Sequence, residues 1–154
     1  MSKTNTVLKA AVVCAAVGMG LLSMTASAKD VVKIAFVGPL TGGVSSIGLG
    51  GRNSADLAVR LRNADPKSKY TYQLVTQDDE CRPNVGVQVA TKVAADKSIV
   101  AGVTHFCSAV AMGTVGVYSR FGLPVIVWGA VLPEITYGND FKEVHRVNGT
   151  MINQ

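Results

Sequence analysis

Two cysteines and a histidine are the residues of this chain best suited to chemistry: Cys81, Cys107 and His105. A thiol beside an imidazole can act as a nucleophile, cysteines with histidines can hold zinc, and two thiols in an oxidising compartment form a disulfide. His105 lies two residues from Cys107, but in an oxidising compartment a disulfide is the expected state of two such cysteines. His145 is the only other histidine, which leaves too few zinc ligands. We therefore expect a Cys81–Cys107 disulfide, no catalytic residue and no metal site.

The acidic triplet Asp78-Asp79-Glu80 is a second candidate. Three carboxylates in a row can bind calcium or supply a general acid or base. No second acidic cluster in the sequence partners them. We therefore expect the triplet to cap a loop, with its side chains in solvent.

A glycine-rich segment, residues 38–51, is predicted to be a loop and is the third candidate. It has no G-x-x-x-x-G-K-[ST], and Gly48-x-Gly50-x-x-Asn53 lacks the last glycine of the dinucleotide pattern, so neither nucleotide motif is present. The segment can still offer oriented backbone N–H groups and hydroxyls to a carboxylate. Those hydroxyls belong to Thr41, Ser45 and Ser46.

The elements that must position these residues alternate between strand and helix. Apolar or β-branched runs predict strands over residues 31–37, 70–76, 99–103 and 124–128. Helical spacing predicts helices over 54–63, 85–96 and 108–120, the last capped by Ser108 and ended by Gly122 and Pro124. One helical turn at 133–137 and a fifth strand within 143–147 are also expected.

This β-α-β-α-β-α-β order predicts an α/β fold, a doubly wound parallel sheet covered on both faces. Ligands of such sheets bind beyond the carboxyl ends of the strands, which are the loops beginning at Gly38, Asp78, Thr104 and Gly129. The two cysteines follow the second and third strands, which either neighbour one another or flank the first. Trp128 ends the fourth strand, where it could be a core residue or a ligand contact.

Residues 1–28 have the pattern of a secretory signal peptide. Lys3 and Lys9 precede an apolar run over 10–22, and Ala26-Ser27-Ala28 resembles a cleavage site. An uncleaved anchor is the alternative, but the apolar run is short for a bilayer. We expect export, cleavage near Ala28 and a mature chain of residues 29–154 in a compartment where cysteines can pair.

Composition narrows the class of protein further. Removing 28 leader residues from 154 leaves 126, enough for one domain. The leader takes two of the 15 basic residues, so 13 remain against 10 acidic residues, a net charge of +3. These basic residues are scattered without interleaved aromatic residues, so nucleic acid is not an expected partner. No G-x-S-x-G occurs, and neither histidine has an obvious serine partner, so no enzyme is indicated.

The segment Val32–Gly42 resembles the opening strand and loop of periplasmic leucine/isoleucine/valine-binding proteins, the substrate-binding proteins of ABC importers with the type I bilobed fold. The resemblance continues in order along the chain. It covers residues 77–83, 104–108, 122–125, 133–136 and 146–150.

The resemblance implies the first lobe of that fold, with no enzymatic activity and no cofactor. It implies a monomer that captures an amino acid or small amide in the periplasm and delivers it to the transmembrane subunits of an ABC permease. Ser108 then directs its hydroxyl and N–H toward the ligand carboxylate, and carbonyls near Gly129 face the ammonium. Ile47 matches the first-loop residue that packs on the ligand side chain. The ligand-binding run after the fourth strand falls on Gly129, Ala130 and Val131.

Three positions depart from the family pattern. Val131 has no hydroxyl where the family usually has Thr or Ser, Ile47 replaces an aromatic ring, and Trp128 stands where a small residue or proline is common. These departures leave the ligand open among branched-chain and similar amino acids, amides and other small carboxylates.

Family members are more than twice as long as the expected mature chain. Residues 29–154 are therefore expected to form an incomplete, truncated N-terminal lobe, which would not bind amino acids tightly alone. A ligand-sensing domain of a receptor or regulator with the same fold is the alternative function.

Overall fold

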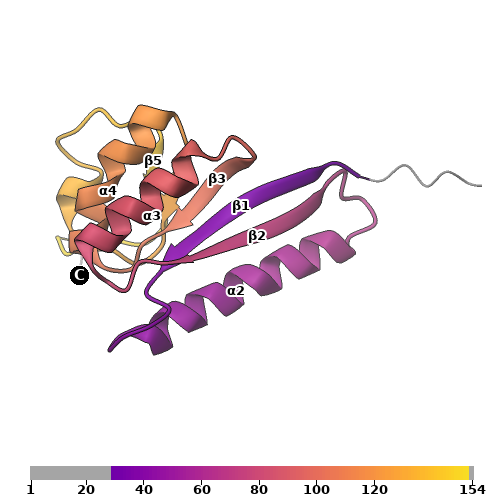
Figure 1. The fold of residues 1–154 in the computed structure, drawn as a ribbon, viewed down its shortest axis with the longest axis horizontal. Coiled ribbons are helices and arrows are strands. Elements are labelled where there is room, and N and C mark those ends of the chain that lie inside the picture. Colours follow the sequence, from indigo (N-terminus) through magenta and orange to yellow (C-terminus); the bar gives the residue numbers. More distant parts are fainter. Residues whose placement is uncertain (1–28, 153–154) are drawn as a thin grey trace, which may run out of the picture.

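The computed structural model describes residues 29–152, so the signal peptide expected at 1–28 lies outside the described residues. Strands and helices alternate along the chain, as predicted (Figure 1). Their bounds are β1 Val31–Gly38, α2 Ser45–Ala64, β2 Thr71–Asp78, α3 Pro83–Ala95, β3 Ile99–Thr104, α4 Ser108–Phe121, β4 Val125–Val127, the 3-10 helix η1 Pro133–Ile135 and β5 Val144–Arg146.

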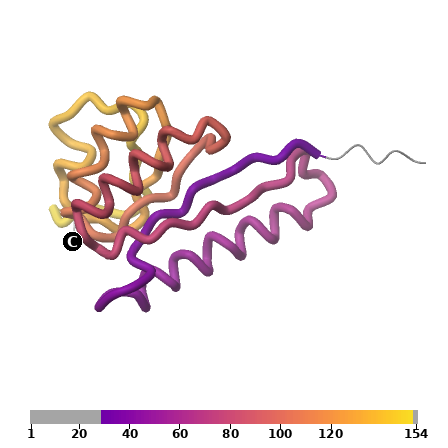
Figure 2. The backbone as a smooth tube through the Cα atoms, in the orientation of Figure 1, coloured from indigo at the N-terminus to yellow at the C-terminus, as the bar shows by residue number. Residues whose placement is uncertain are grey.

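The sheet has five strands in the order β2-β1-β3-β4-β5, and every neighbouring pair is parallel. From β1 the chain moves outward to β2, then crosses back over β1 to build β3, β4 and β5. Because parallel crossovers are right-handed, this reversal places helices on opposite faces of the sheet. Figures 1 and 2 show α2 along β1 and β2, and α3 and α4 grouped on the other side. The predicted doubly wound α/β fold is confirmed.

The core lies between the sheet and the α3–α4 pair. Alternate residues of β4 show which face is covered, since Val125 and Val127 are buried while Ile126 is 41% exposed. Tyr118 of α4 and Val37 of β1 are fully buried in the same layer. Within residues 29–152, no helix is long and apolar enough to cross a membrane.

The first helix starts earlier than its sequence suggests. The glycine-rich segment was expected to be a loop through Gly51, but α2 begins at Ser45 and contains Gly48, Gly50 and Gly51. A Cβ on Gly48 would overlap the backbone carbonyl of Pro39. A Cβ on Gly51 would crowd the rings of Trp128 and Phe36. Two of these glycines therefore let the helix approach the sheet closely, at the expense of the helix propensity on which the prediction relied.

Candidate functional site

The strand order of the sheet reverses between β1 and β3, so the carboxyl ends of these two strands form its switch point. The loop after β1 leads to α2 on one face, and the loop after β3 leads to α4 on the other. A crevice between two such loops is where open α/β sheets bind ligands. The loop after β4 follows at the same edge, since β4 pairs with β3 in parallel. This edge brings together most of the residues that the sequence singled out.

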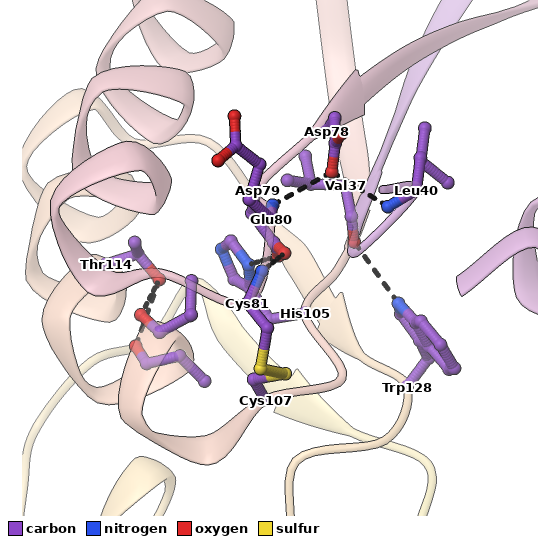
Figure 3. A network of polar contacts seen from close by, with 12 residues as sticks. Val37, Leu40, Asp78, Asp79, Glu80, Cys81, His105, Cys107, Thr114 and Trp128 are labelled. Atoms are coloured by element: carbon purple, nitrogen blue, oxygen red, sulfur yellow. Dashed lines mark hydrogen bonds and ion pairs between the residues drawn. A yellow bond between two sulfur atoms is a disulfide. The ribbon is translucent and has the colours of Figure 1, made fainter. Parts of the chain in front are cut away.

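Asp78, the first residue of the acidic triplet, fastens the loop after β1 (Figure 3). Its Oδ1 accepts hydrogen bonds from the backbone N–H groups of Leu40 at 2.8 Å and Glu80 at 2.9 Å, and its Oδ2 accepts one from the Thr41 hydroxyl at 2.6 Å. Burial opposes ionisation of this carboxyl, but these hydrogen bonds outweigh it and lower the pKa of Asp78 below its ordinary value. Asp78 thus organises a loop, as expected.

Asp79, by contrast, is completely buried, so the expectation that the triplet is solvated is wrong at this position. Its Oδ2 lies 2.8 Å from Nδ1 of His105, whose Nε2 lies 3.0 Å from the hydroxyl of Tyr118. Burial, together with the charge of Asp79, raises the pKa of the Tyr118 hydroxyl. All three side chains satisfy one another, as buried polar groups must. The trio is a structural element beneath the crevice.

The predicted disulfide between Cys81 and Cys107 is present, with Cα atoms 5.5 Å apart (Figure 3). The bridged loops follow β2 and β3, which flank β1, so the second of the two expected arrangements holds. Bonded cysteines leave no thiol nucleophile at this site. Among residues 29–152, no group of three or more His, Cys, Asp or Glu side chains is placed to hold a metal ion.

Ser108 joins the loops after β3 and β4. It is the first residue of α4 rather than its cap, because Cys107 occupies the N-cap position with extended backbone. The Ser108 hydroxyl oxygen instead accepts the backbone N–H groups of Val131 at 3.1 Å and Leu132 at 3.4 Å. Its own hydrogen remains available to a ligand. Two parts of the predicted site, Ser108 and the segment 129–131, are therefore in direct contact.

The loop after β4 is also held by two residues to which the sequence assigned no role, one at the end of β5 and one just after it. Arg146 donates to the carbonyls of Ala130 at 3.1 Å and Leu132 at 2.6 Å, and Asn148 donates to Ala130 at 2.9 Å. Both residues lie in the segment 146–150 that carried part of the resemblance. Arg146 and Asn148 also line a polar cavity of about 370 Å³ beside β5.

Trp128 forms the centre of an aromatic group at the mouth of the crevice. Its ring centroid lies 5.7 Å from that of Phe36 and 5.5 Å from that of Phe106, and its indole N–H donates to the Val37 carbonyl at 3.3 Å. Gly129 lies against Phe106, where a Cβ would overlap the ring. Trp128 therefore packs as a partly buried residue and still reaches the mouth.

Ile47 lies in the first turn of α2 and is 44% exposed. It was expected in the loop after β1, and the early start of α2 moves it onto the helix. Its apolar side chain remains accessible near the carboxyl end of β1.

The chain resembles known proteins along most of its described length. The family model described as periplasmic binding protein matches residues 31–146. The leucine-, isoleucine-, valine-, threonine- and alanine-binding protein of Pseudomonas aeruginosa is 33% identical over 123 residues, 79% of this chain and 32% of that protein. The Leu/Ile/Val-binding protein of Escherichia coli K12 is 35% identical over 115 residues, 74% of this chain and 31% of that protein.

Solved structures share the fold. The branched-chain amino acid transporter substrate-binding protein of Streptococcus pneumoniae, in complex with isoleucine, aligns with a TM-score of 0.72 and 20% identity over 79% of this chain and 34% of that chain. A solute-binding protein of Rhodopseudomonas palustris, in complex with 4-hydroxybenzoate, aligns with a TM-score of 0.68 and 18% identity. The alignment covers 79% of this chain and 33% of that chain. This chain spans about a third of the length of the relatives that it matches.

Proposed function

Because the chain belongs to the periplasmic binding protein family, whose members are substrate-binding proteins and not enzymes, we propose that it supplies the N-terminal ligand-binding lobe of an ABC transporter's substrate-binding component. The expected substrates are branched-chain or similar amino acids, amides and other small carboxylates. The observation that supports this most is the contact between Ser108 and the backbone of Val131 and Leu132, which joins the loops after β3 and β4 at the edge where the ligand is proposed to bind.

The site offers hydrogen-bond donors to a carboxylate. The first N–H groups of a helix have no partner within the helix, and α4 presents those of Ser108 and Ala109 at the crevice. The helix dipole adds a partial positive charge at the same place. The Ser108 hydroxyl hydrogen provides a third donor, since its oxygen is already used as an acceptor.

The rest of the ligand would contact apolar groups. Ile47 is exposed at the start of α2, and Trp128 and Phe106 form an aromatic wall beside Gly129. A relative of known structure holds isoleucine and another holds 4-hydroxybenzoate, two ligands that share a carboxylate and an apolar body. A carboxylate is thus the common chemical feature on which we base the proposal.

The proposal includes location and partners. The family is periplasmic, and the leader pattern at 1–28, with a cleavage site near Ala28, fits export of this chain. The proposed partners are the transmembrane subunits of an ABC permease. The protein would bind them as a monomer with its ligand bound.

Isothermal titration of the purified chain with leucine, isoleucine, valine and small amides tests the proposal. Because the lobe alone is expected to bind weakly, the ligands are added at millimolar concentration. We expect weak, saturable heat with at least one of them or with a small carboxylate, reduced in Ser108→Ala and unchanged in Ser54→Ala, whose hydroxyl bonds only within α2. Saturable heat that survives in Ser108→Ala, or no heat with any of these ligands or with small carboxylates, would refute the assignment.

A further inference from the structure

Resting on the proposed function, we infer that Arg146 is a positioning residue for the ligand carboxylate, which acts through the loop after β4 and makes the Ser108 hydroxyl a stronger hydrogen-bond donor. Arg146 ends β5, and in this role it acts without touching the ligand. The path from its guanidinium to the crevice consists of one peptide group and one hydroxyl.

The first step of this path is the contact of Arg146 with two carbonyls of the loop. Its Nη1 donates to Ala130 at 3.1 Å, and its Nη2 donates to Leu132 at 2.6 Å. Because a guanidinium is planar and rigid, these two bonds fix the orientation of the backbone between the two carbonyls. An arginine side chain stays charged in proteins, so both carbonyls accept from a positive charge.

The second step crosses the peptide group between Ala130 and Val131. The Ala130 carbonyl, which also accepts from Asn148 at 2.9 Å, belongs to the same peptide group as the Val131 N–H. That N–H donates to the Ser108 Oγ atom at 3.1 Å. Hydrogen bonds in a chain polarise one another, so a peptide group whose oxygen accepts from a cation becomes a stronger donor at its nitrogen.

The third step is the Ser108 hydroxyl itself. Its oxygen accepts from Val131 and, at 3.4 Å, from Leu132, which leaves its hydrogen to be donated to a ligand. The same cooperativity makes this hydrogen a stronger donor. Hydrogen bonds that involve a charged group contribute more than neutral ones, so the gain is larger for a charged acceptor. Arg146 should therefore raise the preference of the site for a carboxylate over a neutral amide of the same shape.

Two matched pairs of probes test the inference. They are leucine with leucinamide, and 4-methylpentanoate with 4-methylpentanamide, which lack the ammonium group. Within each pair only the carboxylate is replaced by a neutral amide, so the ratio of the two affinities measures the preference. Trp128 is the single tryptophan of the chain and lies at the crevice, so its fluorescence reports binding. Binding of neither carboxylate would refute the proposed function itself.

Substitution of Arg146 should change this ratio. We expect Arg146→Gln to lower it about fivefold through weaker carboxylate binding, and Arg146→Lys, which keeps the charge, to stay within about twofold of the wild type. Arg60→Gln is the matched control, because it removes an exposed arginine charge on α2, and it should leave the ratio unchanged. A merely structural role would weaken both probes alike. An unchanged ratio in Arg146→Gln would thus overturn the inference and leave the proposed function intact.

A double-variant cycle tests whether the effect passes through Ser108. When Ser108 is already alanine, the last bond of the path is gone, so Arg146→Gln should change the ratio by less than about twofold. A fivefold effect that persists in Ser108→Ala would mean that the charge acts directly through space, and it would contradict the path.

The wild-type chain offers a test that does not depend on how the variants fold. A carboxylate bound to the Ser108 hydroxyl makes the Ser108 oxygen a better acceptor, so the hydrogen bond from the Val131 N–H should strengthen. The amide proton of Val131 should then move further downfield with the carboxylate than with the matching amide, each at saturation. A ¹H–¹⁵N correlation spectrum measures both shifts, and equal shifts would contradict the path.

Discussion

The Nδ1 atom of His105 lies 2.8 Å from the Oδ2 atom of Asp79, and neither side chain is exposed to solvent. This hydrogen bond joins the loops after β2 and β3 across the intervening β1, as the Cys81–Cys107 disulfide does alongside it. Glu80, Cys81 and His105 have φ between 52° and 57°, so both loops turn tightly through the left-handed region. The two links hold these turns in place and thereby fix the start of α4, where Ser108 lies.

Removing the buried carboxylate should be costly. Asp79→Ala leaves His105 without its partner in the interior, and we expect a loss of about 3 kcal/mol in the free energy of unfolding. The control is Asp56→Ala, which breaks the exposed ion pair with Arg60 and should cost about 0.5 kcal/mol or less. Urea unfolding followed by circular dichroism measures both. Equal losses in the two variants would show that the buried pair contributes nothing special.

Reducing the disulfide should also destabilise the fold. The bridge closes a loop with a sequence separation of 26, which corresponds to about 3.5 kcal/mol in the chain-entropy model. A reductant should therefore lower the urea midpoint of the wild-type chain. The double variant Cys81→Ser with Cys107→Ser should have the lower urea midpoint from the start, and the reductant should not change it. A midpoint that depends on the reductant in that variant would contradict the assignment of the disulfide to these two cysteines.

Two glycines of α2 should respond in opposite directions to the same substitution. Gly48→Ala places a methyl group on the Pro39 carbonyl, so the helix must move and stability should fall by about 2 kcal/mol. A Cβ on Gly50 meets no atom within 4 Å, so Gly50→Ala should stabilise by about 0.5–1 kcal/mol through helix propensity. Thermal or urea unfolding distinguishes the outcomes. Stabilisation by both substitutions would mean that α2 does not approach the β1 loop as described.

The strands and the disulfide were predictable because their signals are local. Buried parallel strands are continuous apolar runs, and the segments beginning at Val31, Ile99 and Val125 have that character. The sequence also places the two cysteines after strands that neighbour one another or flank a third, in a chain with an export pattern. A disulfide is the expected state of such a pair.

The early start of α2 and the Asp79–His105 pair were not predicted because both are tertiary features. Gly48 lies in α2 against the Pro39 carbonyl, which leaves no room for a Cβ, and local helix propensity does not record that contact. Burial of Asp79 depends on the strand order β2-β1-β3. One signal was present, however, since Asp79 and His105 are separated by 26 positions, the same spacing as the two cysteines.

Stability should depend on pH through Asp78. Its pKa in the folded chain lies below the ordinary value of 3.8, so its hydrogen bonds stabilise the fold above that pH and lose this contribution as the pH falls through the lower folded pKa. The stability difference between the wild type and Asp78→Asn should be constant from pH 7 to 5 and shrink below about pH 4. Thr41→Val removes one of the hydrogen bonds to the Asp78 carboxylate. The stability of this variant should therefore fall less between pH 5 and pH 2.5 than the stability of the wild type does. A difference that stays constant down to pH 2.5 would disprove the link.

The most direct measurement for the central claim is a ¹H–¹⁵N correlation spectrum of the labelled chain, titrated separately with leucine and with 4-methylpentanoate, which is leucine without its ammonium group. If the crevice binds the ligand carboxylate, the largest amide shifts will centre on Ser108, Ala109 and Gly129, and the indole N–H of Trp128 will move with them. Largest shifts beside β5, around His145 and Thr150, or no shifts with either probe, would contradict a substrate site at the carboxyl ends of β1, β3 and β4.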